Sequence, residues 1–205
     1  MSDPSPTSDD CAAAAAAAAL ARAVADYRAD ENVGRLHAAL MALIHSATAD
    51  TLVTAVEPYR DIPEVAGPVY EHVVLQQPGN ARALVILANA YWLTGRGPEV
   101  VGELAARALA IDQTNRGAWH LWALTESRPR QRVERWRAVT ARFPDDDLAL
   151  ASLADNAASL AGAEQDPAAL ALALDAYGTL RSRAQHPAQR AALDQALGVL
   201  RGWRL

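Results

Sequence analysis

Apolar side chains recur along this chain at intervals of three and four residues, and short polar segments rich in Gly, Pro, Asn and Asp interrupt them. This spacing places the apolar residues on one face of an α-helix, whereas no segment shows the alternating pattern of a β-strand. The pattern therefore predicts an all-α fold of consecutive helices joined by short turns. We expect helices at about residues 10–29, 31–46, 51–59, 61–76, 80–93, 98–111, 115–124, 130–143, 146–161, 166–183 and 187–200.

Prolines indicate the period of this pattern and some of its helix boundaries. Pro78 and Pro144 each end an apolar helix, and they lie two periods of about 33 residues apart, which is the spacing of stacked helix pairs. Asp61 and Glu64 have the spacing of a capping box at a helix start. Pro68 falls inside the same helix and predicts a late start or a kink.

The two ends of the chain differ from the middle. We expect residues 1–8 to be a disordered tail, residues 9–48 to form an alanine-rich helix and a capping helix, and residues 49–205 to form the repeat domain. Leu20, Val24 and Tyr27 give the alanine-rich helix only a weak apolar stripe. The last helix has no following partner, so it should cap the stack.

Composition supports the helical interpretation and narrows the class of protein. Hydrophobic residues make up 51% of the chain but aromatic residues only 5%, so Ala, Leu and Val must build the core. The net charge of −5 argues against a general phosphate-binding surface. The single cysteine, Cys11, suits a reducing compartment, and the acidic N-terminus is unlike an export leader. We therefore expect a cytoplasmic protein.

The first helices of three hairpins share a spacing of side-chain types. A large apolar residue is followed three, four and seven positions later by an apolar, a small and an aromatic residue. The middle hairpin has Leu84, Leu87, Ala88 and Tyr91, the first has Leu52, Ala55, Val56 and Tyr59, and the third has Trp119, Trp122 and Ala123, with Glu126 replacing the aromatic residue.

The second helices share another spacing, in which a small residue, an aromatic, a small residue and a proline follow one another. The three sets are Ala66, Tyr70, Val73 and Pro78; Val101, Ala105, Ala108 and Gln113; and Arg132, Trp136, Val139 and Pro144. Between Leu52 and Pro144 the chain thus resembles the tetratricopeptide-repeat family. The resemblance implies a right-handed stack of antiparallel helix hairpins, with capping helices at both ends.

The resemblance also implies a function, which is to bind a protein or peptide in a groove lined by the first helices. The groove positions carried over from the family are Val53, Glu57, Arg60, Arg82, Val85, Asn89, Trp92, His120, Leu124 and Arg128, with Asp155 from a weaker fourth hairpin. Val85 stands where the family's clamp for chaperone tails has a lysine, so chaperone-tail binding is not predicted. The alanine-rich helix could be a cap, or it could be a detachable ligand that lies in this groove.

The sequence contains no recognisable motif of catalytic, metal-binding or cofactor-binding residues, and helix packing or capping explains the candidate residues. The run Asp145, Asp146 and Asp147 precedes a helix, whose N-terminus favours anions. His120 lies in a packed repeat position, and Cys11 has no base beside it in the sequence. We therefore expect a non-catalytic adaptor with no cofactor, no metal and no membrane contact.

An alternative function rests on the densest positive charge in the chain. The arginines are Arg128, Arg130, Arg132, Arg135, Arg137 and Arg142. Such a face could be an ordinary solvated helix surface, could bind an anionic protein partner, or could follow nucleic-acid phosphates with Trp136 stacking on a base. The packing position of Trp136 and the acidic residues that follow disfavour a nucleic acid, and an enzyme on a helical scaffold is the weakest alternative.

Overall fold

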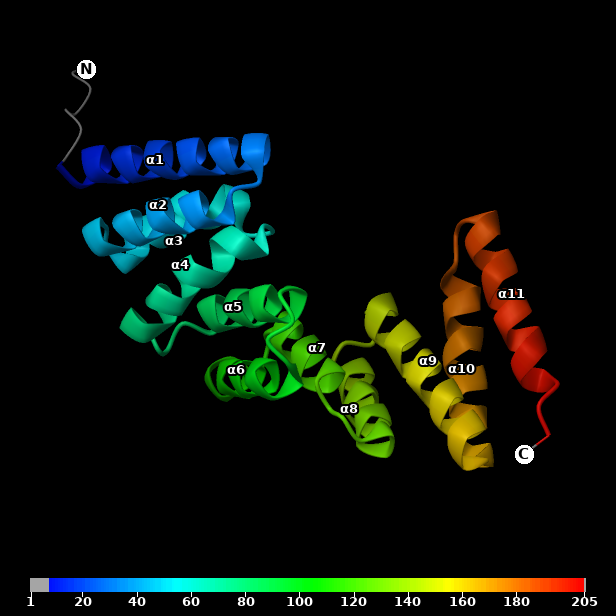
Figure 1. The fold of residues 1–205 in the computed structure, drawn as a ribbon. Coiled ribbons are helices and arrows are strands. Elements are labelled where there is room, and N and C mark those ends of the chain that lie inside the picture. Colours follow the sequence, from blue (N-terminus) through cyan, green and yellow to red (C-terminus); the bar gives the residue numbers. More distant parts are fainter. Residues whose placement is uncertain (1–7, 205) are drawn as a thin grey trace, which may run out of the picture. The chain divides into compact units, whose positions relative to one another are not determined.

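The computed structural model describes residues 8–204, and these residues form helices joined by short turns (Figure 1). Residues 1–7, which make up most of the expected tail, lie outside the described residues. No β-strand occurs between residues 8 and 204, in agreement with the all-α prediction. The helices are α1 (Ser8–Asp30), α2 (Val33–Ser46), α3 (Ala49–Val56), the 3₁₀-helix η1 (Glu57–Tyr59), α4 (Pro63–Gln76), α5 (Ala81–Leu93), α6 (Pro98–Ile111), α7 (Arg116–Leu124), α8 (Pro129–Arg142), α9 (Asp147–Glu164), α10 (Pro167–Arg183) and α11 (Pro187–Arg201).

Most helices begin where the sequence predicts because the cap or proline at the start acts locally. The side chain of Asn80 accepts a hydrogen bond from the Ala83 N–H at 3.0 Å and so caps α5. Asp146 and Asp166 cap α9 and α10 in the same way. Pro98 opens α6, where its missing N–H leaves no intrahelical bond unmade.

The start of α4 differs from the prediction. The helix begins at Pro63, its preceding residue Ile62 provides no side-chain cap, and the expected capping box of Asp61 and Glu64 does not form. Asp61 lies outside the helix with a side chain that is 92% exposed. Because Pro63 suits the first helical position by itself, the boundary does not need Asp61. The helix then continues through Pro68, so the late start expected at that proline does not occur.

Two compact units divide the described chain, the first ending at Leu121 and the second beginning at Trp122. In the first unit, α1 packs on α2 and α3, α2 contacts α4, and α3 to α6 pack in succession. Its core contains Leu20, Leu40, Leu52, Tyr70 and Leu84, all buried. The helices thus form sequential hairpins, while the predicted boundary at residue 48 remains a prediction.

The second unit continues the hairpin pattern with smaller side chains. Helices α8, α9, α10 and α11 pack in chain order, and alanines such as Ala157 and Ala173 are completely buried where α9 meets α10. Small side chains let helix backbones approach closely, which explains how an alanine-rich sequence makes a core. In α11, Leu197 and Leu200 are buried as expected, whereas Leu193 is half-buried.

Candidate functional site

Helix α5 is buried on one side and exposed on the other, and the exposed side carries four of the predicted groove residues. Arg82, Asn89 and Trp92 are exposed and Val85 is half-buried. Their spacing of three and four residues keeps them within one face of the helix. On the opposite side the buried apolar residues hold α5 in the hairpin stack; they are Ala83, Leu84, Leu87, Ala88 and Ala90.

One end of this face carries a cluster of charged residues from two elements. The Oε1 atom of Glu57 accepts hydrogen bonds from Arg60 Nη1 at 2.8 Å and from Arg82 Nη2 at 2.6 Å. Glu57 and Arg60 come from η1 and the turn after it, whereas Arg82 comes from the first turn of α5. The structure therefore brings three predicted groove residues into direct contact.

The interior side of the same cluster contains two polar atoms with no hydrogen-bond partner among the described residues. They are Glu57 Oε2 and the hydroxyl oxygen of Tyr70, and both are buried. Burial raises the pKa of the Tyr70 hydroxyl, and the negative charge of Glu57 raises it further. Tyr70 therefore stays protonated beside the cluster, whose three charged side chains, Glu57, Arg60 and Arg82, are 40%, 47% and 59% exposed.

The same side of α5 meets α7 at Val85. A Cβ atom added to Gly117 would lie 3.0 Å from Val85 Cγ1, so α7 approaches α5 too closely for a larger residue to fit without movement. His120, which follows on α7, is half-buried. In the first unit the predicted groove residues thus lie on α3 (Val53, half-buried), on η1 and the turn after it, on α5 and on α7. Helix α5 contacts both η1 and α7.

The remaining predicted groove residues belong to the second unit. Leu124 is partly exposed at the end of α7. Arg128 lies in the turn before α8, where its Nε atom is 3.1 Å from Glu126 Oε1. Asp155 is exposed on α9 and accepts a short hydrogen bond from the hydroxyl of Tyr177 on α10. Desolvation of the hydroxyl, together with that bond, raises the pKa of Tyr177 to about 12.

Glu126 occupies the position where the repeat pattern expects an aromatic residue, and it is only 6% exposed. Its carboxylate accepts hydrogen bonds from the backbone and side chain of Arg128, and it pairs with Arg135 Nη2 at 2.7 Å. The Arg128 hydrogen bonds, with a smaller effect from the charge of Arg135, lower the pKa of Glu126 to about 2. A charged cluster thus replaces the aromatic side chain at this position.

The arginine-rich face suspected of binding nucleic acid is largely paired within the second unit. Arg130 bonds to Glu164 and Asp166, Arg132 to Asn156, and Arg137 to Glu134. Arg135 also lies over the ring of Trp122, 4.6 Å from its centroid. The carboxylates offset the charges of Arg130 and Arg137, whereas Arg132 bonds to a neutral amide. This partial pairing weakens the nucleic-acid alternative.

The described residues hold no group of three or more His, Cys, Asp or Glu side chains placed to bind a metal. In the acidic run before α9, Asp146 caps the helix and Asp147 pairs with Arg183 at 3.0 Å. Cys11 is a free, exposed thiol on α1. Among the described helices, none combines the length and the apolar character that a membrane crossing requires.

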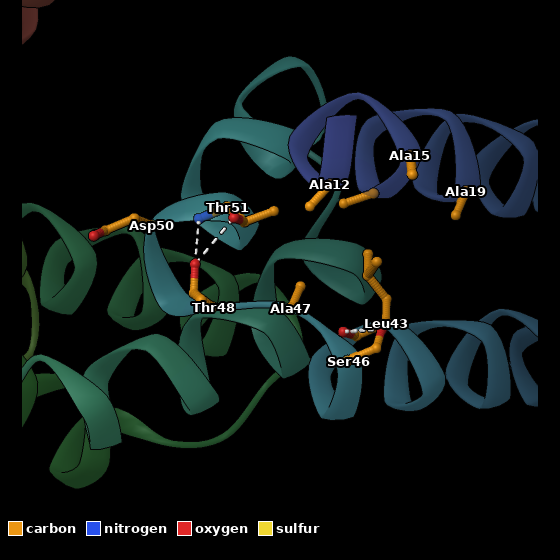
Figure 2. Close-up of a pocket in the computed structure, with 10 residues that line it drawn as sticks. Ala12, Ala15, Ala19, Leu43, Ser46, Ala47, Thr48, Asp50 and Thr51 are labelled. Carbon is orange, nitrogen blue, oxygen red and sulfur yellow. Dashed lines mark hydrogen bonds between the residues drawn. The ribbon is translucent and has the colours of Figure 1, made fainter. Parts of the chain in front are cut away.

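Helix α1 packs on α2 and α3 through Leu20 and Val24, which are both buried. Its N-terminal half faces a cleft of about 590 Å³ at the junction of α2 and α3, because Ala12, Ala15 and Ala19 are too short to fill it (Figure 2). The nearby Thr48 hydroxyl caps α3 by accepting the Thr51 N–H. This packing favours the interpretation of α1 as part of the hairpin stack over that of a detachable ligand.

The sequence matches no protein-family model, and it matches no curated protein. Solved structures with a similar fold do exist. Two structures of MamA align with TM-scores of 0.59 and 0.57 at 15% sequence identity, covering 89% and 83% of this chain and 100% and 96% of the MamA chains. PilF of Pseudomonas aeruginosa aligns with a TM-score of 0.60 at 15% identity, covering 95% of this chain and 86% of PilF.

The chain has a tetratricopeptide-repeat-like fold. At this level of identity the alignments establish the fold alone, and they confirm the resemblance drawn from the repeat spacing. The exposed face of α5 lies on the first helix of a tetratricopeptide-like hairpin, which is where the sequence placed the binding groove.

Sequence reasoning missed two features of the candidate surface. Leu93, beside Trp92 at the end of α5, is 59% exposed, and its position four residues after Asn89 could have identified it. The close approach of Gly117 to Val85 had no sequence signal, because it depends on how α7 packs against α5.

Proposed function

We propose that this protein is a non-catalytic adaptor that binds a segment of a partner protein along the exposed face of α5. The observation that carries the proposal is the contrast between the two sides of this helix. One side is buried in the hairpin stack, whereas the other presents Trp92 and Leu93 to solvent, with exposed fractions of 38% and 59%. Exposed aromatic and large apolar side chains beside polar groups are typical of binding surfaces.

The neighbouring residues support a peptide-sized ligand. Asn89 offers an exposed amide in the middle of the face, and Arg82 with Arg60 offers hydrogen-bond donors at one end. A helix face with apolar anchors and a few polar groups suits an extended or helical segment that contributes side chains to it. His120 extends this surface onto α7, whereas Leu124, Arg128 and Asp155 belong to the second unit and stay predictions from the sequence.

A selection from a random-peptide library on the immobilised full-length protein tests the proposal. Peptides that are enriched should bind in solution, and the double substitution Asn89→Ala and Trp92→Ala should weaken their binding by about tenfold or more. The control is Leu75→Ala, which removes a more exposed apolar side chain from α4. Binding that survives the double substitution, or that falls equally in the control, would show that α5 is not the binding surface.

The expected cytoplasmic location remains a prediction that rests on the acidic N-terminal sequence and the single cysteine. The proposal itself does not depend on it.

A further inference from the structure

The charged cluster at the start of α5 has a fixed orientation. Both arginines bond to the same oxygen, Glu57 Oε1, while the other oxygen of that carboxylate is buried. The side chains of Arg60 and Arg82 are 47% and 59% exposed. The Glu57 side chain is 40% exposed, so a ligand that approaches from solvent meets the guanidinium N–H groups beside one partly exposed carboxylate.

The cluster has one more positive than negative charge, so its charge favours the binding of an additional anion. One carboxylate faces two guanidinium groups, each of which carries five N–H donors and a permanent positive charge. Asp61 also lies near Arg60, but at 3.9 Å and with a side chain that is 92% exposed, so its charge is screened by water. The donors that Glu57 does not use match the geometry of an incoming carboxylate.

The apolar end of the face lies at a defined distance from this cluster. Arg82 and Trp92 are separated along α5 by about 15 Å, because each helical residue adds about 1.5 Å. An extended chain advances about 3.3 Å per residue, so it covers this distance in about four or five residues. A single short segment can therefore contact both ends of the face.

We propose that the partner segment is acidic and extended, with an Asp or Glu side chain bound by Arg60 and Arg82 and an apolar side chain bound at Trp92 and Leu93. The two side chains lie about four or five residues apart in the ligand. This inference rests on the proposed function, because it names the chemistry of the segment that α5 binds. Glu57 is a positioning residue in this arrangement, since its Oε1 atom holds the two arginines side by side.

The test uses the full-length protein and fluorescence anisotropy with labelled peptides whose C-termini are amidated, so that only side chains supply carboxylates. One peptide set carries an acidic residue and a Leu or Phe at the expected spacing within randomised flanks. Its matched set replaces Asp and Glu by Asn and Gln, and a third set uses Lys. We expect the acidic set to bind about tenfold tighter than the amide set, and this preference should shrink as salt increases.

Substitutions in the protein then show which arginines cause the preference for acidic peptides. Arg60→Gln and Arg82→Gln should each remove most of the difference between acidic and amide peptides, while Arg107→Gln, which removes an exposed arginine from α6, should keep it. Asp61→Asn should strengthen binding of the acidic set two- to threefold at most, as expected for removal of one exposed charge. If an arginine variant does not fold, as judged by circular dichroism, the peptide comparison on the unsubstituted protein decides the question alone.

The outcomes separate this inference from the proposed function. Equal binding of acidic and amide peptides, both lost with Trp92→Ala, would overturn the acidic ligand and leave the α5 surface in place. A preference for Lys peptides, or an Arg107→Gln effect equal to that of Arg82→Gln, would also overturn it. Failure of every peptide set to bind would overturn both proposals.

Discussion

The Nη2 atom of Arg82 lies 2.6 Å from Oε1 of Glu57, although the two residues are 25 positions apart in the sequence. This ion pair connects η1 to the first turn of α5 and places Arg82 beside Arg60. Exposed ion pairs of this kind contribute roughly 0–1 kcal/mol to stability. Its main consequence is therefore the arrangement of the two guanidinium groups on the candidate binding face.

Tyr70→Phe should leave the free energy of unfolding unchanged or increase it. The Tyr70 hydroxyl is buried without a hydrogen-bond partner among the described residues, and an unmade bond of this kind costs about 1–3 kcal/mol. Tyr91→Phe is the matched control, because the Tyr91 hydroxyl donates to Glu71 at 2.6 Å and its loss should destabilise by about 1–2 kcal/mol. Urea unfolding measures both. An equal loss in the two variants would mean that the Tyr70 hydroxyl has a partner in solution, such as a bound water.

Gly117→Ala should fail to stabilise the protein, although alanine favours helices. The added Cβ would lie 3.0 Å from Val85 Cγ1, so Val85 or α7 must move by a few tenths of an ångström. Gly178→Ala in α10, where a Cβ meets nothing within 4 Å, should stabilise by about 0.5–1 kcal/mol. In the double variant Gly117→Ala with Val85→Ala, the penalty at Gly117 should disappear. Thermal melts of the unsubstituted protein, the two single variants and this double variant measure the coupling between positions 85 and 117. Additive effects would argue against the contact between α5 and α7.

Glu126→Gln should destabilise the second unit by about 2 kcal/mol at neutral pH, because it breaks a buried carboxylate cluster with Arg128 and Arg135. Folding lowers the pKa of Glu126 from its ordinary 4.5 to about 2, so the ionised carboxylate stabilises the fold above pH 4.5. That contribution is lost as the pH falls from about 4.5 to about 2. The difference in unfolding free energy between the two proteins should therefore shrink over this window.

The control for Glu126 is Glu134→Gln, since Glu134 pairs with Arg137 on an exposed face of α8. Its cost should stay below about 0.5 kcal/mol at every pH. A Glu126→Gln difference that does not change with pH would show that the carboxylate is not held by the arginines.

Leu20→Ala should destabilise the protein by about 2–4 kcal/mol and leave peptide affinity unchanged. Leu20 is buried where α1 packs on α2 and α3, so truncation leaves a cavity there. Val33→Ala, at an exposed position on α2, should cost little. Both are measured by unfolding and by binding of a selected peptide. A rise in peptide affinity in Leu20→Ala alone would indicate that α1 competes for the α5 face as a detachable ligand.

Local features of the sequence predicted most helix boundaries correctly. Pro98 and Ile111 bound α6 as expected, and Asn80 and Asp146 cap their helices through contacts three residues away or less. The prediction failed at Asp61, because Pro63 offers a competing helix start two residues later. Such competition between neighbouring signals cannot be resolved from either signal alone.

The sequence predicted which residues belong to the groove, but it did not predict which of them contact one another. The repeat spacing placed Glu57, Arg60 and Arg82 among the groove positions, but it contained no sign that one carboxylate oxygen would bind both arginines. It also placed Glu126 at an aromatic position without indicating that two arginines would compensate for its burial. These contacts join residues on different elements, whose side chains meet only after the helices have packed.

The sequence alone determined the helical class, the hairpin succession and the exposed side of α5. These follow from the periodicity of apolar residues and from caps and prolines, which act within one or two helical turns. Only the tertiary structure decided which charges are paired, which polar atoms are buried without partners and where α7 touches α5. The physical reason is that burial and ion pairing depend on distances between elements, and packing sets those distances after the local helices are specified.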